Sequence, residues 1–181
     1  MSSKNKKLLQ KFRVPLGFIF AAVFLIFAKP TLFLMLIGIS IAFTGLLIRG
    51  WSAGHIRKNK ELAVSGPYTF TRNPLYLGSF LLGLGFMIAS GIWWLVVLFI
   101  ILYLGIYFPV MSVESDELTE IFGEKYKEYA MKVSLFFPWF SNYKSDGKKF
   151  EKELYMRYRE YQAGLGFLAI CAVLILKAYF F

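Results

Sequence analysis

The chain has 181 residues, of which 57% are hydrophobic, 19% aromatic and only 18% charged, and its net charge is +10. Its mean hydropathy is +0.56. A soluble domain of this length needs more polar side chains to cover its surface, so the composition favours a protein embedded in a membrane. The single cysteine, Cys171, excludes an intramolecular disulfide and a cysteine-based metal site.

Long uncharged runs predict the membrane spans, because about 20 apolar residues cross a hydrocarbon core about 30 Å thick. Lys29–Pro30 and Gly91 interrupt these runs and predict tight turns, which arrange the first four spans as two hairpins. The first run is expected to be retained as a span, since it lacks the small-residue cleavage site of a signal peptide. The expected spans are about 12–28, 31–51, 74–89 and 92–113, followed by a fifth span at the C-terminus.

The basic residues predict the orientation of these spans. Of the 21 Lys and Arg residues, five lie within 1–13, five within 49–72 and nine within 125–159. With five spans these segments fall on one side of the membrane, which the positive-inside rule assigns to the cytoplasm. We therefore expect a multi-pass protein of the plasma (inner) membrane with a cytoplasmic N-terminus. Topology and anionic lipids account for the positive charge, so membrane lipids are expected partners and nucleic acid is not. No pattern predicts the oligomeric state.

The chain is expected to divide into a functional core and a C-terminal extension. Residues 1–145 form the core, which is all-α and carries a pocket on its cytoplasmic side. Within it, apolar residues at helical spacing after the fourth span predict an amphipathic helix over 113–132. Residues 146–181 are expected to form a charged helix that continues directly into the extra span.

The stretch SGPYTFTRNPLYLG, residues 65–78, lies where the chain re-enters the membrane. Ser-Gly-Pro is turn chemistry, Asn73 is a natural helix cap, and Pro74 suits the first turn of a helix. The free N–H groups of that turn favour the carboxylate of a zwitterionic ligand, and the neighbouring aromatic rings favour a cationic centre. The alternative is that Tyr68, Arg72 and Tyr76 only anchor the helix at the interface.

Glu114 is a second candidate functional residue. Helical spacing places it on the side of Leu118 and Ile121, and an acid on the apolar side of a span is costly without a partner. The alternative is a carboxylate that reaches the interface or pairs with Arg72. His55 is the only histidine, so it cannot form a metal site and is expected to be an ordinary interfacial residue.

These two regions together carry a resemblance. SGPYTFTRNPLYLG, followed about 35 residues later by ESDELTEIFGEKYKEYAMKV and FFP, resembles the isoprenylcysteine carboxyl methyltransferase family, which is related to the phospholipid methyltransferases. The family pattern is G-x-Y, R-[HN]-P-x-Y-x-G, a helical hairpin, and then E-E-x-x-L-x-x-x-F-G-x-x-Y-x-x-Y. The match covers about residues 45–138.

The resemblance implies an integral-membrane enzyme that uses S-adenosylmethionine, with no metal. It implies a lipophilic small molecule or a lipid as the methyl acceptor, and it makes Arg72 and Glu114 the candidate catalytic residues. Methyl transfer needs orientation and exclusion of water, and the sulfonium supplies the electrophile. The implied cofactor-binding residues are Lys60, Glu61, Leu62, Ala63, Tyr68, Asn73, Pro74, Leu75, Tyr76 and Glu114.

Three positions depart from the family pattern. Asn73 stands where the carboxyl methyltransferases usually have His, and Ser115 replaces the second Glu of the acidic pair. Val110 stands where the prenylcysteine enzymes have an Arg thought to hold the substrate carboxylate. Because Val cannot neutralise a carboxylate, prenylcysteine is not the expected acceptor.

Two other functions fit part of the pattern. A membrane reductase related to the steroid 5α-reductases would share the R-[HN]-P-x-Y signature and bind NADPH. A non-catalytic lipid-binding scaffold would explain Val110 and Ser115. The acidic and Tyr-rich pattern after residue 114 favours the methyltransferase.

Overall fold

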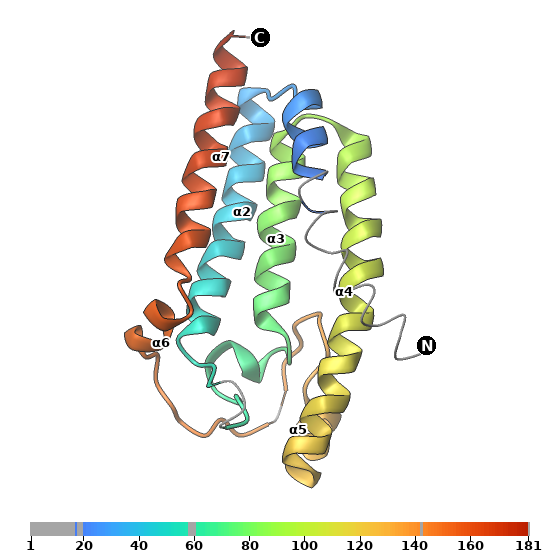
Figure 1. Ribbon diagram of the computed structural model, residues 1–181, viewed down its shortest axis with the longest axis vertical. Helices are drawn as coiled ribbons and strands as arrows, with labels where there is room; N and C mark the ends of the chain where they lie inside the picture. Colours follow the sequence, from blue (N-terminus) through green and yellow to red (C-terminus); the bar gives the residue numbers. More distant parts are fainter. Residues whose placement is uncertain (1–16, 18–19, 58–60, 142, 181) are drawn as a thin grey trace.

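The computed structural model describes residues 17, 20–57, 61–141 and 143–180 and is all-helical over them, with no strand. Its long helices stand side by side (Figure 1). The elements are α2 (Leu32–Ala53), the 3₁₀ helix η1 (Gly66–Thr69), α3 (Pro74–Ala89), α4 (Trp93–Phe122), α5 (Glu124–Lys132), α6 (Lys152–Arg157) and α7 (Tyr161–Phe180).

The helices confirm an all-α integral membrane protein. Among the described residues, α2, α4 and α7 are long and apolar enough to cross a membrane, and α3 is an apolar helix of 16 residues. The bounds of α3 coincide with the expected span 74–89. The expected span 12–28 lies partly outside the described residues, and residues 20–27 of it are helical.

The polar connections gather at one end of the molecule. In Figure 1, η1, α5 and α6 lie together at that end, whereas the two hairpin turns and the end of α7 lie at the other. The turns are themselves joined, because the Lys29 N–H donates to the Ser90 carbonyl at 2.8 Å. Gly91 has φ +75°, a left-handed conformation that favours glycine. Both predicted turns are therefore confirmed.

The fourth span runs directly on into the amphipathic segment. α4 continues unbroken through Pro109 to Phe122. The break comes at Gly123, which has φ +56° and starts the short α5. The predicted single helix over 113–132 is therefore wrong. The apolar spacing is present, but the glycine divides it.

The C-terminal extension is also divided. The charged helix was expected to run on into the last span, but α6 ends at Arg157 and α7 begins at Tyr161. Arg159 between them has φ +53°, the one positive φ of a non-glycine residue in the described part of the chain. A left-handed residue ends the helical hydrogen-bond ladder, so α6 and α7 are separate helices.

Glycines allow α2 and α3 to approach closely. Gly38 and Gly45 on α2 are seven residues apart, as are Gly78 and Gly85 on α3, so each pair lies along one helix face. A Cβ atom on Gly85 would overlap the backbone of Ala42 and Gly38, and one on Gly45 would overlap the backbone at Gly78 and Leu82. We call these four residues the glycine seam. Small residues of this kind are how membrane helices pack without a hydrophobic driving force between them.

The glycine seam generates a stability prediction. Gly85→Ala should lower the unfolding free energy by about 1–3 kcal/mol, because the added methyl group must push two backbones apart. Gly105→Ala on α4 is the matched control, since nothing lies within 4 Å of its added Cβ. Thermal unfolding in detergent measures both, and equal melting temperatures for the two variants would contradict close packing at the seam.

Candidate active site

The first residue pair of the site joins α3 to α4. The Tyr76 hydroxyl donates to Glu114 Oε1 at 2.7 Å, and both side chains are half-buried. Glu114 therefore has a neutral partner instead of the Arg72 guanidinium considered as an alternative. A hydrogen bond to a carboxylate fixes the direction of that carboxylate, so Tyr76 orients Glu114 within the space between the helices.

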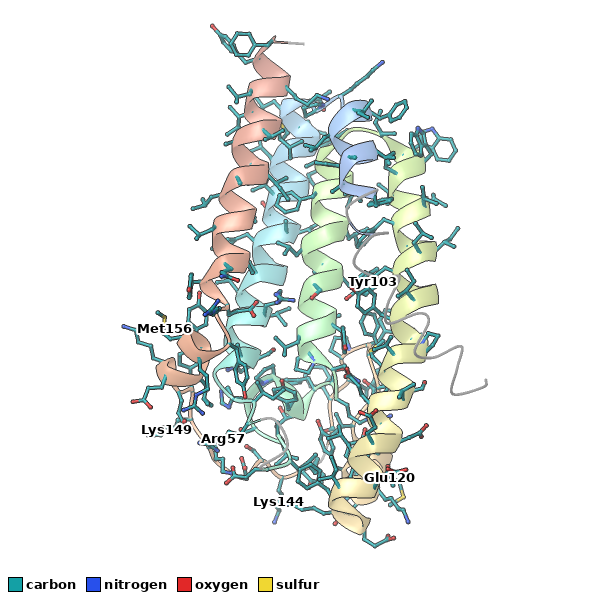
Figure 2. The ribbon with its side chains drawn as sticks, viewed as in Figure 1. Arg57, Tyr103, Glu120, Lys144, Lys149 and Met156 are labelled. Atoms are coloured by element: carbon teal, nitrogen blue, oxygen red, sulfur yellow. The ribbon has the colours of Figure 1, made fainter. Side chains whose placement is uncertain are left out.

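Tyrosines on α4 hold Tyr76 from behind. The Tyr103 hydroxyl donates to the Tyr76 carbonyl at 2.7 Å, and the Tyr107 ring lies 5.4 Å from the Tyr76 ring. The Tyr103 and Tyr107 rings stack at 4.3 Å. Figure 2 shows Tyr103 between α3 and α4. Both the backbone and the ring of Tyr76 are thus fixed by α4.

Arg72 contacts Ser115, the residue that follows Glu114 on α4. Its Nη1 donates to Ser115 Oγ and to the Tyr126 hydroxyl, each at 3.3 Å, and Tyr126 donates to Ser115 Oγ at 2.9 Å. The guanidinium carbon is 6.0 Å from the centre of the Tyr126 ring. Arg72 Nε is buried and has no hydrogen-bond partner. One donor of this cation is therefore available to a ligand.

Tyr68 supplies a second unpartnered donor. Its side chain is 5% exposed and its hydroxyl has no hydrogen-bond partner, while its carbonyl accepts from the Tyr129 hydroxyl at 2.7 Å. Burial raises the pKa of Tyr68, and Tyr158, Glu114 and Glu160 raise it further, so the hydroxyl keeps its proton. Buried donors without a partner are rare in folded proteins and mark places where water or a ligand binds.

Asn73 occupies the N-cap position of α3, but its side chain makes no capping bond. The predicted side-chain cap is wrong. The Asn73 amide instead donates to the Leu135 carbonyl at 2.9 Å, because the chain after α5 passes directly beneath the start of α3. Thr71 Oγ1 donates to the Phe136 carbonyl at 2.9 Å, and the Arg72 N–H donates to the Ser134 carbonyl at 2.9 Å. Residues 71–73 are thus bound to residues 134–136.

The remaining predicted site residues lie around this centre. Pro74 is buried in the first turn of α3, and the half-buried Leu75 accepts from Ser79 Oγ at 2.8 Å through its carbonyl. Leu62 is buried against Tyr126 and Tyr129. Lys60 lies outside the described residues.

Glu61 and Ala63 line a shallow cleft of about 170 Å³ including open solvent. Glu61 is exposed and pairs with Arg57 at 2.9 Å and with Lys148. Figure 2 shows Arg57 at the polar end of the molecule, beside α6. The other lining residues are His55, Arg57, Leu62, Ser65, Asp146 and Lys148.

His55 is buried within this cleft. The sequence instead predicts an ordinary interfacial residue at this position. His55 is 8% exposed, its Nδ1 lies 2.9 Å from Ser65 Oγ, and Phe150 packs against its ring. Burial lowers the pKa of His55 and Arg57 lowers it too, whereas Asp146 and Glu151 oppose that shift. The ring is therefore neutral at pH 7.

Sequence reasoning missed the tyrosines that organise the site. Tyr126 and Tyr129 are nearly fully buried, and their hydroxyls hold Ser115 and the Tyr68 carbonyl. Their spacing, Y-x-x-Y on α5, is part of the family pattern, but the pattern predicts no partner for either hydroxyl. The signal was present in the residue type. A buried tyrosine hydroxyl needs a hydrogen-bond partner, so two tyrosines on an apolar helix face indicate polar atoms opposite them.

The chain is similar to known proteins. A family model described as phospholipid methyltransferase matches residues 23–125. A cobalt-zinc-cadmium resistance protein of Cupriavidus metallidurans is 37% identical over 116 residues, which is 61% of this chain and 50% of the relative. A nickel-cobalt-cadmium resistance protein of Alcaligenes xylosoxydans xylosoxydans is 32% identical over 117 residues, covering 61% and 51%.

A protein-S-isoprenylcysteine O-methyltransferase of Schizosaccharomyces pombe is 26% identical over 132 residues, which is 70% of this chain and 56% of that protein. The chain spans about half the length of the curated relatives it matches. No solved structure matches it significantly.

The environment of His55 predicts a pH dependence of stability. Because the folded state lowers the pKa of His55, the unfolded chain binds the proton more readily, and stability falls as the pH drops below about 6.5. The melting temperature should therefore decrease more between pH 7.5 and pH 5 for the wild type than for His55→Gln. His55 is the only histidine, so the difference between the two slopes isolates its contribution. Parallel slopes would contradict a buried neutral ring.

Proposed function

The chain belongs to the phospholipid methyltransferase family, and from that premise we propose that it transfers a methyl group from S-adenosylmethionine to a lipophilic, membrane-resident acceptor at the cytoplasmic face. The observation that carries this proposal is the 2.7 Å hydrogen bond from Tyr76 to Glu114, flanked by buried donors that have no partner. It joins the two motif segments, which are far apart in the sequence, in one polar site at the base of apolar helices.

The donors present suit the polar groups of S-adenosylmethionine. Its carboxylate and ribose hydroxyls accept hydrogen bonds, and the free Tyr68 hydroxyl and Arg72 Nε–H are donors that lack an acceptor. Its amino group and sulfonium are cationic, and they suit the Glu114 carboxylate and the faces of Tyr76 and Tyr107. These residues would hold the cofactor in the proposed site.

The protein itself would orient the reactants and exclude water from the site. S-adenosylmethionine supplies the electrophilic methyl group when it is bound. Glu114 is aimed by Tyr76, and Tyr76 is held by Tyr103, so the site needs little rearrangement to receive a ligand. Phe136 packs against Phe80 and Phe108 beside the site, which keeps water from the space between α3 and α4.

The lipophilic class of the acceptor follows from the surroundings of the site. Aromatic side chains pack together between α3 and α4, next to Tyr76. Val110, where a cation for a substrate carboxylate would be needed, is 2% exposed. The acceptor is therefore proposed to present an apolar body and no carboxylate that needs position 110. These packed aromatic side chains include Phe80, Phe99, Tyr103 and Tyr107.

Calorimetric titration of the detergent-purified protein tests the proposed cofactor. S-adenosylmethionine and S-adenosylhomocysteine should both bind, because they share the adenosyl and amino-acid groups that the site would hold. NADPH should not bind. Binding of NADPH alone would transfer the assignment to a membrane reductase, and binding of none of the three would favour a non-catalytic scaffold.

Tyr76→Phe and Glu114→Gln test the site itself. Tyr76→Phe removes the hydroxyl that orients Glu114, and Glu114→Gln removes the negative charge that would face the cationic amino group, so each should weaken S-adenosylhomocysteine binding by about tenfold or more. Lys177→Ala is the control, since Lys177 donates to the Leu25 carbonyl at 2.6 Å at the opposite end of the molecule. Wild-type affinity in both site variants would remove Tyr76 and Glu114 from the site.

A further inference from the structure

Glu160 is a buried carboxylate at the start of the C-terminal span. Its side chain is 7% exposed, and it forms a two-pronged ion pair with Arg49 of α2. Arg49 Nε lies 2.5 Å from Oε1 and Arg49 Nη2 lies 3.0 Å from Oε2. The planar guanidinium fork matches a carboxylate in this way, so the pair fixes both position and direction.

The same arginine also reaches α3. Arg49 Nη1 donates to Ser79 Oγ, and Ser79 Oγ donates to the Leu75 carbonyl at 2.8 Å. The arginine stem lies against the α3 backbone, because a Cβ on Gly78 would be 2.7 Å from Arg49 Cγ. A continuous chain of contacts therefore runs from Glu160 through Arg49 to the first turn of α3, which contains Tyr76.

The backbone at Glu160 is shaped for this contact. Arg159 adopts φ +53°, which is costly for a residue with a side chain, and the Glu160 N–H then donates to the Tyr155 carbonyl at 3.2 Å. The turn separates α6 from α7 and directs Glu160 inward. In Figure 1, α7 lies alongside α2, the helix that carries Arg49. A strained backbone persists where the surrounding contacts over-determine it.

Glu160 also acts on the unpartnered hydroxyl of Tyr68. After burial and Tyr158, both Glu114 and Glu160 raise the pKa of that hydroxyl, so Tyr68 senses a carboxylate from α4 and another from the start of α7. The Tyr68 hydroxyl itself is buried and lacks a hydrogen-bond partner. The start of α7 is thus a neighbour of the same polar space that Glu114 faces.

We propose that Glu160 is a positioning residue of the site. Acting through Arg49 and Ser79, it holds in place the first turn of α3, which carries Tyr76. In naming that site the inference rests on the proposed function. It adds a residue beyond 23–125, the part of the chain that the family model matches.

Two variants separate positioning from simple anchoring of α7. Ser79→Ala removes the hydrogen bond between Arg49 and α3 but leaves the ion pair of Arg49 with Glu160 intact. Glu160→Gln removes the ion pair. Ser112→Ala is the matched control for the serine, because Ser112 Oγ donates to the Phe108 carbonyl four residues earlier but is exposed. Glu153→Gln, at an exposed position of α6, is the control for the acid.

The measurements are amide hydrogen exchange and S-adenosylhomocysteine titration on the full-length, detergent-purified chain. Ser79→Ala should accelerate exchange in residues 66–77 and weaken binding by about fivefold, with exchange in α7 unchanged. Glu160→Gln should produce the same changes and also accelerate exchange in α7. Both control variants should match the wild type.

The proposal is overturned if Ser79→Ala leaves exchange in residues 66–77 at the wild-type rate. It is also overturned if Glu160→Gln loosens only α6 and α7. If Glu160→Gln does not fold, Ser79→Ala decides, since it keeps the ion pair. If the wild type binds no S-adenosylhomocysteine, the proposed function fails, and the exchange rates of residues 66–77 still decide the positioning role.

Discussion

The close contact of α2 with α3 is the constraint on which the rest of the structure depends. The glycine seam removes side chains from the interface, so the two backbones meet directly along their length. This contact brings Arg49 on α2 against Gly78 on α3 and within reach of Ser79. It also fixes the start of α3, and with it the height at which Tyr76 meets Glu114.

The polar site is built on the opposite side of α3 by a different kind of packing. Between α3 and α4 the space is filled with aromatic rings, and tyrosine hydroxyls in that layer hold polar atoms. α3 therefore has one face pressed against backbone and another face against rings. The first gives the helix a fixed position, and the second fixes the Tyr76 side chain and backbone beside Glu114.

Much of the fold could be predicted from the sequence because it depends on local rules. Apolar runs and turn residues gave the bounds of α3 and the turn at Gly91. The two breaks at Gly123 and Arg159 were missed, since helical spacing continues across both and only backbone conformation reveals them. Glycines in a span indicate close packing, but which glycine faces which requires the three-dimensional arrangement.

The candidate site could be predicted in its residue types but not in its contacts. Motif spacing identified Tyr76 and Glu114, yet Asn73 was expected to cap its own helix and instead binds the Leu135 carbonyl. Glu160 offered no signal, because a charged residue near a helix start is ordinary in sequence. Its burial depends on Arg49, which is 111 positions away in the chain.

The hydrogen bonds between residues 71–73 and residues 134–136 have a mechanical consequence. Consecutive residues of one segment bind consecutive residues of the other, so the two segments behave as one rigid strap. α5 is continuous with the second segment and carries Tyr126 and Tyr129, whose hydroxyls donate to Ser115 Oγ and to the Tyr68 carbonyl. α5 therefore cannot shift relative to the start of α3 without breaking these hydrogen bonds, although Gly123, with φ +56°, separates it from α4.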